Sequence, residues 1–203
     1  MPDATLHNLV LPEDLPEPIS WPDFFGNDHP VELEVGSGKG LFLANAATAN
    51  PGHNFFGIEL AKKYARRAAD RVAKKQLTNV KVLAGDARLT MSRHVPPRSL
   101  HAVHVYFPDP WWKARHKKRR VFAEPLVNDI ERTLIPGGDL HVVTDVEEYF
   151  GVIQALMATR ERFQNQPLPE LTEPQHELDY LTNFERKYRI EGRPIHRAHY
   201  RMS

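Results

Sequence analysis

Short apolar runs alternate with longer amphipathic stretches from Val31 to the C-terminus, and this alternation restricts the fold more than any other feature. The apolar runs have the length of buried strands, and the stretches between them have the periodicity of surface helices. We therefore predict an α/β fold with a doubly wound, Rossmann-like sheet. The expected strands are 31–35, 54–59, 80–84, 101–107, 140–144, 162–164 and 193–202, and the expected helices are 40–50, 61–76, 122–134 and 146–160.

The length and composition restrict the class of protein further. At 203 residues the chain can form one α/β domain with a sizeable core. It contains no cysteine, which excludes disulfides, thiolate zinc sites and a cysteine nucleophile and is typical of a reducing compartment. No apolar stretch approaches the roughly 20 residues that span a bilayer, and the N-terminus does not resemble a signal peptide. We expect a cytoplasmic protein that does not contact membranes.

The N-terminal segment differs in character from the rest of the chain. Residues 1–30 contain six prolines and little periodicity, so we predict an N-terminal arm followed by a single domain over residues 31–203. The arm could lie on the domain or be partly mobile, and Trp21 could hold it to the core or to a ligand. Residues 1–38 contain eight acids and no Lys or Arg, whereas the remainder has 27 bases against 18 acids. This balance of +9 favours a polyanionic partner for the domain.

A glycine-rich turn, EVGSGKG at residues 34–40, follows the first expected strand. Glycines allow backbone NH groups to approach a ligand without an intervening Cβ. The dinucleotide fingerprint would need glycine at Leu41, and a phosphate loop would need Ser or Thr after Lys39. Because the carboxylate of Glu34 would repel a pyrophosphate, the loop suits a ligand that carries an ammonium or sulfonium charge.

Acidic residues end three successive strands, at Glu34, Glu59 and Asp86. In an open α/β sheet the carboxyl ends of the strands line the ligand crevice. Glu59 could accept hydrogen bonds from the hydroxyl groups of a ribose, and Asp86 could accept one from an adenine amino group. Asp86 could instead cap the following helix. Together the three acids favour a positively charged nucleoside, and S-adenosylmethionine is such a molecule.

The stretch 104–120 combines a strand end, a rigid acid and a basic run. Pro108 and Pro110 restrict the backbone around Asp109, which holds this carboxylate on a stiff loop after the fourth expected strand. Two tryptophans and six Lys or Arg residues follow. The combination suggests chemistry on a nucleobase beside a phosphate-binding surface. Each part alone has a structural alternative: a turn, core aromatics or a solvated charged surface.

Two of these stretches resemble known motifs. Glu34-x-Gly36-x-Gly38-x-Gly40 resembles the first motif of class I methyltransferases. The block FPDPWWKARHKKRR at 107–120 is similar to the signature of the bacterial tRNA (guanine-N7)-methyltransferases, and residues 143–145 and 182–185 match that family's pattern. The resemblance implies a seven-stranded Rossmann-like sheet, mostly parallel with an antiparallel C-terminal strand. It also implies S-adenosylmethionine as the methyl donor and guanine 46 in the variable loop of tRNA as the substrate.

The resemblance also implies roles for individual residues, with Asp109 as the catalytic acid. Thr182 and Glu185 additionally form a capping box, which could be their only role or a second one. Trp112 and the proline-rich arm depart from the family's pattern. The implied donor-binding residues are Glu34, Gly36, Gly38, Gly40, Glu59 and Asp86; the implied substrate-binding residues are Lys113, Asp145, Thr182, Asn183, Phe184 and Glu185; and the implied RNA-binding residues are Arg115, His116, Lys117, Lys118, Arg119 and Arg120.

Some alternatives stay open at the level of the sequence. A second basic cluster between Arg186 and Arg201 could extend the RNA footprint or form a solvated edge strand. A non-catalytic RNA-binding module would explain the basic stretches but not the acids at the strand ends. A methyltransferase acting on small molecules or proteins would have no use for the basic run. The eleven histidines are scattered, so we expect no metal, and both a monomer and a homodimer are compatible with the sequence.

Overall fold

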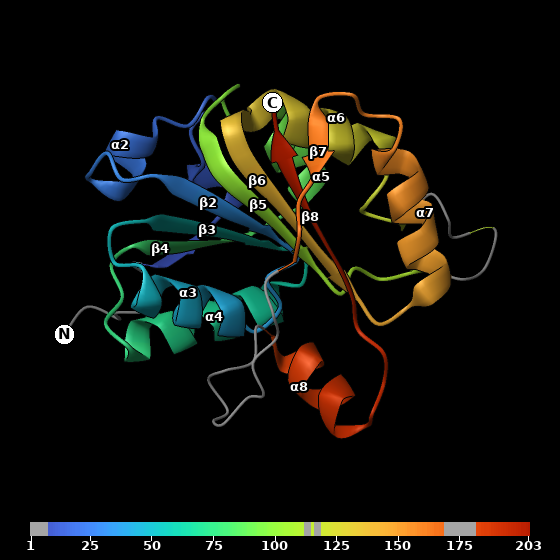
Figure 1. Cartoon of the computed structure of the whole chain (residues 1–203). Helices are drawn as coiled ribbons and strands as arrows, with labels where there is room; N and C mark the ends of the chain where they lie inside the picture. The colour runs from blue at the N-terminus through green and yellow to red at the C-terminus, as the bar shows by residue number, and fades with distance from the viewer. Residues whose placement is uncertain (1–7, 112–114, 116–118, 169–181) are drawn as a thin grey trace.

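The computed structural model describes residues 8–111, 115, 119–168 and 182–203. Its strands form one eight-stranded sheet, which is mostly parallel and ends in antiparallel pairings at β8 (Figure 1). The predicted α/β fold with an antiparallel C-terminal strand is confirmed, with one strand more than expected. In sheet order the strands are β1 (Leu9–Val10), β4 (Val80–Ala84), β3 (Asn54–Glu59), β2 (Val31–Val35), β5 (Leu100–Tyr106), β6 (Leu134–Thr144), β8 (His196–Met202) and β7 (Phe163–Asn165).

Helices cover both faces of the sheet and bury a separate hydrophobic core on each (Figure 1). Helices α3 and α4 share one core with β3 and β4, and α5, α6 and α7 share the other with β2, β5 and β6. None of the helices in the described part of the chain combines the length and apolar character needed to cross a bilayer. The helices are η1 (Pro12–Asp14), α2 (Trp21–Phe25), α3 (Leu41–Ala49), α4 (Lys62–Lys74), α5 (Ala87–Arg93), α6 (Glu124–Thr133), α7 (Glu147–Met157) and α8 (Asn183–Ile190).

The central strands follow the sequence closely because their side chains are buried on both faces. In β3, five of the six residues are buried, and in β2 and β4 four of five are buried. Parallel strands between two helical layers need such continuous apolar runs. These three strands have the predicted bounds. The acids Glu34, Glu59 and Asp86 therefore lie at or next to the carboxyl ends of the strands, as predicted.

The additional strand comes from the N-terminal segment. Strand β1 pairs in parallel with β4 at the edge of the sheet. The side chains of Leu15, Ile19 and Trp21 are buried, and the ring of Trp21 lies 5.7 Å from that of Phe56 in an edge-on contact. Within residues 8–30, these apolar side chains therefore pack against the core. A two-residue strand among prolines has no periodicity in the sequence, so β1 could not be predicted.

Candidate active site

The glycine loop between β2 and α3 turns against the carboxyl end of β3. The NH group of Gly36 donates a hydrogen bond to the carbonyl of Ile58 at 2.8 Å. Gly36, Gly38 and Gly40 have φ angles of +78°, +54° and +69°, in the left-handed region that favours glycine. A Cβ added at Gly40 would lie 2.7 Å from the Cβ of Ala68. Glycine is therefore required both for the turn and for the close approach of α4.

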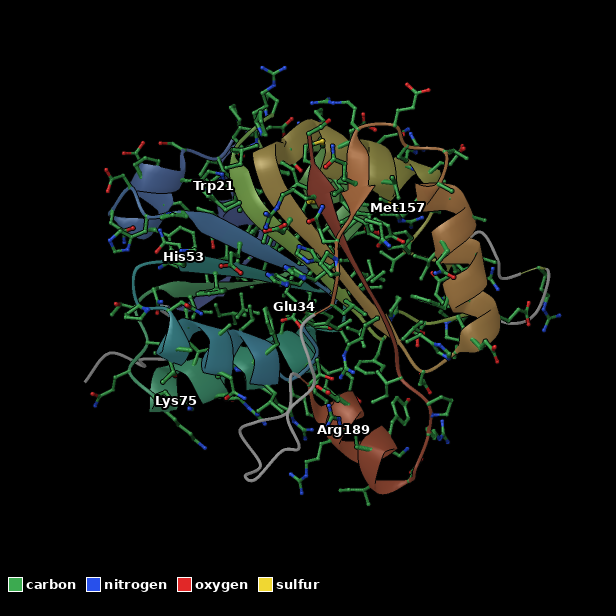
Figure 2. The ribbon with its side chains drawn as sticks, viewed as in Figure 1. Trp21, Glu34, His53, Lys75, Met157 and Arg189 are labelled. Atoms are coloured by element: carbon green, nitrogen blue, oxygen red, sulfur yellow. The ribbon has the colours of Figure 1, made fainter. Side chains whose placement is uncertain are left out.

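Two carboxyl groups lie beside this loop. Glu34 is 2 % exposed, and its Oε2 has no hydrogen-bond partner among the described residues; Figure 2 shows it where the sheet meets the helices. Burial and the neighbouring Glu59 raise the pKa of Glu34 well above its ordinary value. Glu59 accepts hydrogen bonds from the NH groups of Gly38 at 2.8 Å and Ala61 at 2.9 Å. A cationic ligand would satisfy the free oxygen of Glu34 and favour its ionised form.

Asp86, at the end of the third predicted strand, caps helix α5. Its Oδ1 accepts hydrogen bonds from the NH groups of Arg88 at 2.8 Å and Leu89 at 3.4 Å. Asp86 therefore has the helix-capping role that the sequence pattern indicates as the alternative to ligand binding. Its side chain is 40 % exposed, and Oδ2 lies 3.7 Å from the guanidinium of Arg88. The carboxylate keeps acceptor capacity for a ligand, so capping does not exclude a contact with an adenine amino group.

The loop that leaves β5 holds Asp109 at the surface in a strained backbone. Asp109 is exposed, and Phe107 and Trp111 on either side have φ angles of 50° and 44°. Residues other than glycine rarely adopt such angles, which cost about 1–3 kcal/mol each and occur preferentially at functional sites. The NH group of Phe107 donates to the carbonyl of Val143 at 2.7 Å, which anchors the start of the loop to β6.

Arg120 supports this loop from inside the protein. The sequence predicts an RNA contact for Arg120, whereas the structure leaves only 8 % of the residue exposed. Its Nε donates to the carbonyl of Pro110 at 2.7 Å, and its guanidinium lies over the ring of Tyr149 at 4.8 Å. This is a correction to the predicted set, because a guanidinium engaged in this way is not presented to a phosphate. Arg115 and Arg119 are exposed, as an RNA contact requires.

Helix α8 contributes the second group of predicted substrate residues. Thr182 Oγ1 accepts a hydrogen bond from the NH group of Glu185 at 3.1 Å, so the capping role of Thr182 is present in the structure. Glu185 is 2 % exposed, and its carboxylate accepts hydrogen bonds from Arg189 at 3.1 Å and from Arg197 on β8. These contacts fix the position of α8 relative to the C-terminal strand.

Further contacts place α8 against the loops that follow β5 and β6. The rings of Tyr188 and Phe107 lie 5.5 Å apart, and the guanidinium of Arg193 lies over the ring of Tyr188 at 4.8 Å. Arg193 also forms an ion pair with Asp145 at 3.3 Å. The pKa of Tyr188 is raised by burial and by the nearby carboxylates of Asp145 and Asp109. Asp109, Asp145 and α8 therefore gather at the same edge of the sheet.

Tyr106, at the end of β5, is a site residue that the sequence did not indicate. Burial raises its pKa well above the ordinary value, and the carboxyl groups of Glu34, Glu32 and Glu185 add to the effect. The hydroxyl group lies 2.8 Å from Nδ1 of His104. Tyr106 is thus a neutral phenol whose surroundings include the carboxyl groups of Glu34 and Glu185. A tyrosine in an apolar strand is typical of core packing, so the sequence carried no signal for this position.

Part of the predicted site lies outside the described residues. Lys113, His116, Lys117 and Lys118 fall in the segments 112–114 and 116–118, and the side chains of Asn183 and Phe184 are not described. Their roles stay predictions.

One group of possible metal ligands occurs within the described ranges, at Asp139, His141 and His199, whose ligand atoms all lie within 4.8 Å of one another. Asp139 already accepts two hydrogen bonds from Arg201, at 2.9 and 3.0 Å, and one from His199 at 2.7 Å. Burial and the neighbouring His104 and His199 lower the pKa of His141 to about 3. The positive charge of Arg201 next to the carboxylate opposes a metal cation, so the geometry favours an ion-paired network.

The fold and the site together define a class I methyltransferase, a class of enzyme that uses S-adenosylmethionine as its methyl donor. Residues 28–198 match the family model Methyltransf_4, which describes a methyltransferase family. Among solved structures, the 16S rRNA methyltransferase KamB has a TM-score of 0.65 at 18 % identity, over 90 % of this chain and 92 % of that chain. The aminoglycoside resistance methyltransferase NpmB1 has a TM-score of 0.60 at 16 % identity, over 88 % and 90 %. These similarities concern the fold.

Curated relatives share much more of the sequence. The tRNA (guanine-N(7)-)-methyltransferase of Rhodopirellula baltica is 48 % identical over 199 residues, which cover 95 % of this chain and 73 % of that protein. The enzyme of the same name from Geobacter metallireducens is 35 % identical over 197 residues, which cover 96 % and 92 %. The chain belongs to the tRNA (guanine-N7)-methyltransferase family, and the family predicted from the sequence is confirmed.

Proposed function

We propose that this chain transfers the methyl group of S-adenosylmethionine to N7 of guanine 46 in the variable loop of tRNA, in the cytoplasm. One observation carries the proposal within this family: the buried carboxyl group of Glu34, one oxygen of which has no hydrogen-bond partner among the described residues, lies at the same sheet edge as the strained loop of Asp109. The first suits a cationic donor, and the second presents a carboxylate where a nucleobase can reach it.

The donor site is formed by groups whose chemistry complements S-adenosylmethionine. When bound, this cofactor supplies an electrophilic methyl group on a positively charged sulfur. The free oxygen of Glu34 suits the ammonium group of its methionine part, and Gly36, Gly38 and Gly40 leave the backbone open to close contact. Glu59 suits the ribose hydroxyl groups, and Asp86 suits the adenine amino group.

The target atom needs no general base, because guanine N7 carries a free lone pair. The enzyme therefore acts by positioning the base and by stabilising charge. Positive charge develops on the purine as the new bond forms, and the carboxylate of Asp109 stabilises it or orients the base through N1–H or the exocyclic amine. To reach the site, the base must be exposed or flipped out of its stack.

The remaining predicted residues hold the nucleotide and the RNA around it. In this proposal the nucleotide is held by Lys113, Asp145 and residues 182–185. Arg115 and residues 116–119 contact phosphates. Glu185 is buried and accepts hydrogen bonds from two arginines, so its main contribution in this proposal is to fix α8 beside the nucleotide.

Incubation with labelled donor and unmodified tRNA, followed by nucleoside mapping, tests this function. We expect one 7-methylguanosine at position 46 and no product on a tRNA that carries adenine there. Asp109→Ala is expected to retain donor affinity and lose most of its turnover. A competing function, an RNA-binding module without catalysis, predicts no donor binding in equilibrium dialysis, and that result would overturn the proposal.

A further inference from the structure

Helix α4 carries a dense basic surface that the proposed reaction does not use. Its buried side consists of Ala65, Ala68, Ala69 and Val72. Its opposite side carries six cations and a single acid, Asp70, and a seventh cation, Lys75, follows at the C-cap. We call these seven the basic face of α4. They are the exposed Lys62, Lys63, Arg66, Arg67, Lys74 and Lys75 and the partly buried Arg71.

The cations of the basic face have no acidic partners within the described ranges of the chain, where no ion pair involves any of the seven. Several are spaced four residues apart, as in Lys62 and Arg66 or Lys63 and Arg67, so like charges face each other along the helix. The first turn carries two lysines and no acid, which also opposes the helix dipole. The two cations of the last turn agree with the helix dipole, so the unfavourable charges are those of the first two turns. A dense strip of cations without acidic partners is best explained by a polyanionic partner.

The basic face begins next to the donor site and leads away from it. The NH group of Ala61, just before α4, donates to Glu59 at 2.9 Å, and Ala68 closely approaches Gly40 of the glycine loop. The helix then runs for roughly 20 Å. Figure 2 shows Lys75 at the end of α4 far from Glu34.

We infer that the basic face of α4 binds the phosphate backbone of RNA outside the loop that contains the target guanine. The inference rests on the proposed function, because it concerns how a large RNA lies when one of its loops enters the site. It adds an RNA surface on the α3–α4 side of the molecule to the one expected after Asp109. RNA fits better than a compact anion, because the cations form a strip along a helix rather than a cluster around a pocket.

The test compares RNA binding by two variants with the same change in net charge. In the first, Lys63→Gln, Arg67→Gln and Lys74→Gln remove three exposed cations distributed along the length of the basic face. In the matched control, Arg93→Gln, Arg98→Gln and Arg162→Gln remove exposed cations at the end of α5 and just before β5 and β7. Each protein is titrated with full-length tRNA, and with a short hairpin that contains only the target loop, at several salt concentrations.

For full-length tRNA, we expect the α4 variant to bind at least tenfold more weakly at low salt. Each lost phosphate contact lowers the log–log salt slope by about 0.7 to 0.9, so the slope should fall by about 2. The hairpin and the control variant should show no such change, and thermal melting confirms folding. An unchanged tRNA slope, or an equal loss with the hairpin or in the control, overturns the inference. The methylation assay with wild-type protein is a separate measurement: if it yields no methylated tRNA, the proposed function is rejected, whatever the binding data show.

Discussion

Helix α4 and the C-terminal segment from Arg186 to Arg201 are both rich in cations, yet they use them in opposite ways. In the C-terminal segment at least four of the five arginines are paired with acids: Arg189 and Arg197 with Glu185, Arg193 with Asp145, and Arg201 with Asp139. The cations of α4 have no such partners in the part of the chain that the structure describes. The sequence leaves the role of the C-terminal cluster open, and the pairing favours a structural role over an RNA contact.

The same distinction separates two buried acids of the site. Glu185 lies between two arginines, whereas Glu34 keeps an oxygen without a partner among the described residues. A buried charge that is already paired stabilises the fold, and a buried polar group that lacks a partner is suited to a ligand. The comparison therefore favours a structural role for the ion pairs of Glu185, in addition to the nucleotide contact proposed for residues 182–185. It favours a binding role for Glu34 and for the basic face of α4.

The largest expected effect is on stability and concerns the ion-paired arginines of the C-terminal segment. Arg197→Ala leaves the carboxylate of Glu185 with one arginine in a buried position. Breaking a buried ion pair from one side costs about 3–5 kcal/mol when the remaining charge is left without a partner. Because Arg189 stays beside Glu185, denaturant unfolding should show a loss toward the lower end of this range. The matched control is Arg201→Ala on the same strand, whose ion pair with Asp139 is half exposed at the arginine. Solvent-exposed pairs of this kind contribute little to stability, so the control should lose much less. Equal losses in the two variants would remove the distinction between structural and surface pairing.

The second prediction separates two neighbouring arginines of the basic run. Arg120→Ala removes the hydrogen bond to Pro110, so the Asp109 loop should shift and turnover should fall by about tenfold to a hundredfold. Donor affinity and the salt dependence of tRNA binding should stay unchanged. Arg119→Ala is the control, because Arg119 is exposed. It should instead reduce the salt slope by about 0.7 to 0.9 with a smaller effect on turnover. A reduced salt slope for Arg120→Ala would return this residue to the RNA-binding set.

The third prediction concerns pH and compares two glutamates on β2. The folded protein keeps Glu34 protonated to higher pH than the unfolded chain does, because its pKa is raised by burial and by Glu59. Wild-type stability should therefore fall as pH rises from the ordinary carboxyl pKa toward the raised one. Glu34→Gln should lack this fall, and should bind the donor at least about tenfold more weakly because a charged hydrogen bond is lost.

Glu32→Gln is the control for this prediction and should behave in the opposite way. Burial disfavours the charged form of Glu32, but hydrogen bonds with His104 and His53 lower its pKa overall. Its contribution to stability is present above the ordinary carboxyl pKa and is lost on acidification. Unfolding curves across pH and donor titrations by calorimetry check both variants. A donor affinity that Glu34→Gln leaves intact would contradict the assignment of Glu34.

The sequence predicts those parts of the molecule that depend on local patterns. Strands β2, β3 and β4 have the predicted bounds, because buried parallel strands are continuous apolar runs between turns. Once the bounds of these strands are known, the positions of the acids at their carboxyl ends are known as well. Helix α5 is not among the expected helices because it has only seven residues, although the sequence indicates Asp86 as a candidate cap for a following helix.

The pairing of cations could not be predicted, because it depends on contacts between distant residues. Arg201 and Asp139 are separated by 62 residues, and Arg197 and Glu185 meet only when α8 folds back onto β8. Arg120 and Arg119 are adjacent and chemically identical, yet one is buried and the other exposed. A basic run in the sequence therefore indicates a polyanionic partner only where the fold leaves its cations without acids.

The smallest expected effect concerns how much the like charges of the basic face reduce the free energy of unfolding. Replacing Lys63, Arg67 and Lys74 by Gln keeps helix propensity and removes repulsion between like charges. Each such pair destabilises a helix by about 0.2–0.5 kcal/mol, so the variant should unfold at a slightly higher denaturant concentration at low salt. The gain should vanish at high salt, where exposed charges are screened. The control triple variant at Arg93, Arg98 and Arg162 should show no gain, because two of these arginines face acids, Glu17 and Glu131. A stability loss in the α4 variant would mean that its cations support the fold, and the comparison with the C-terminal segment would then fail.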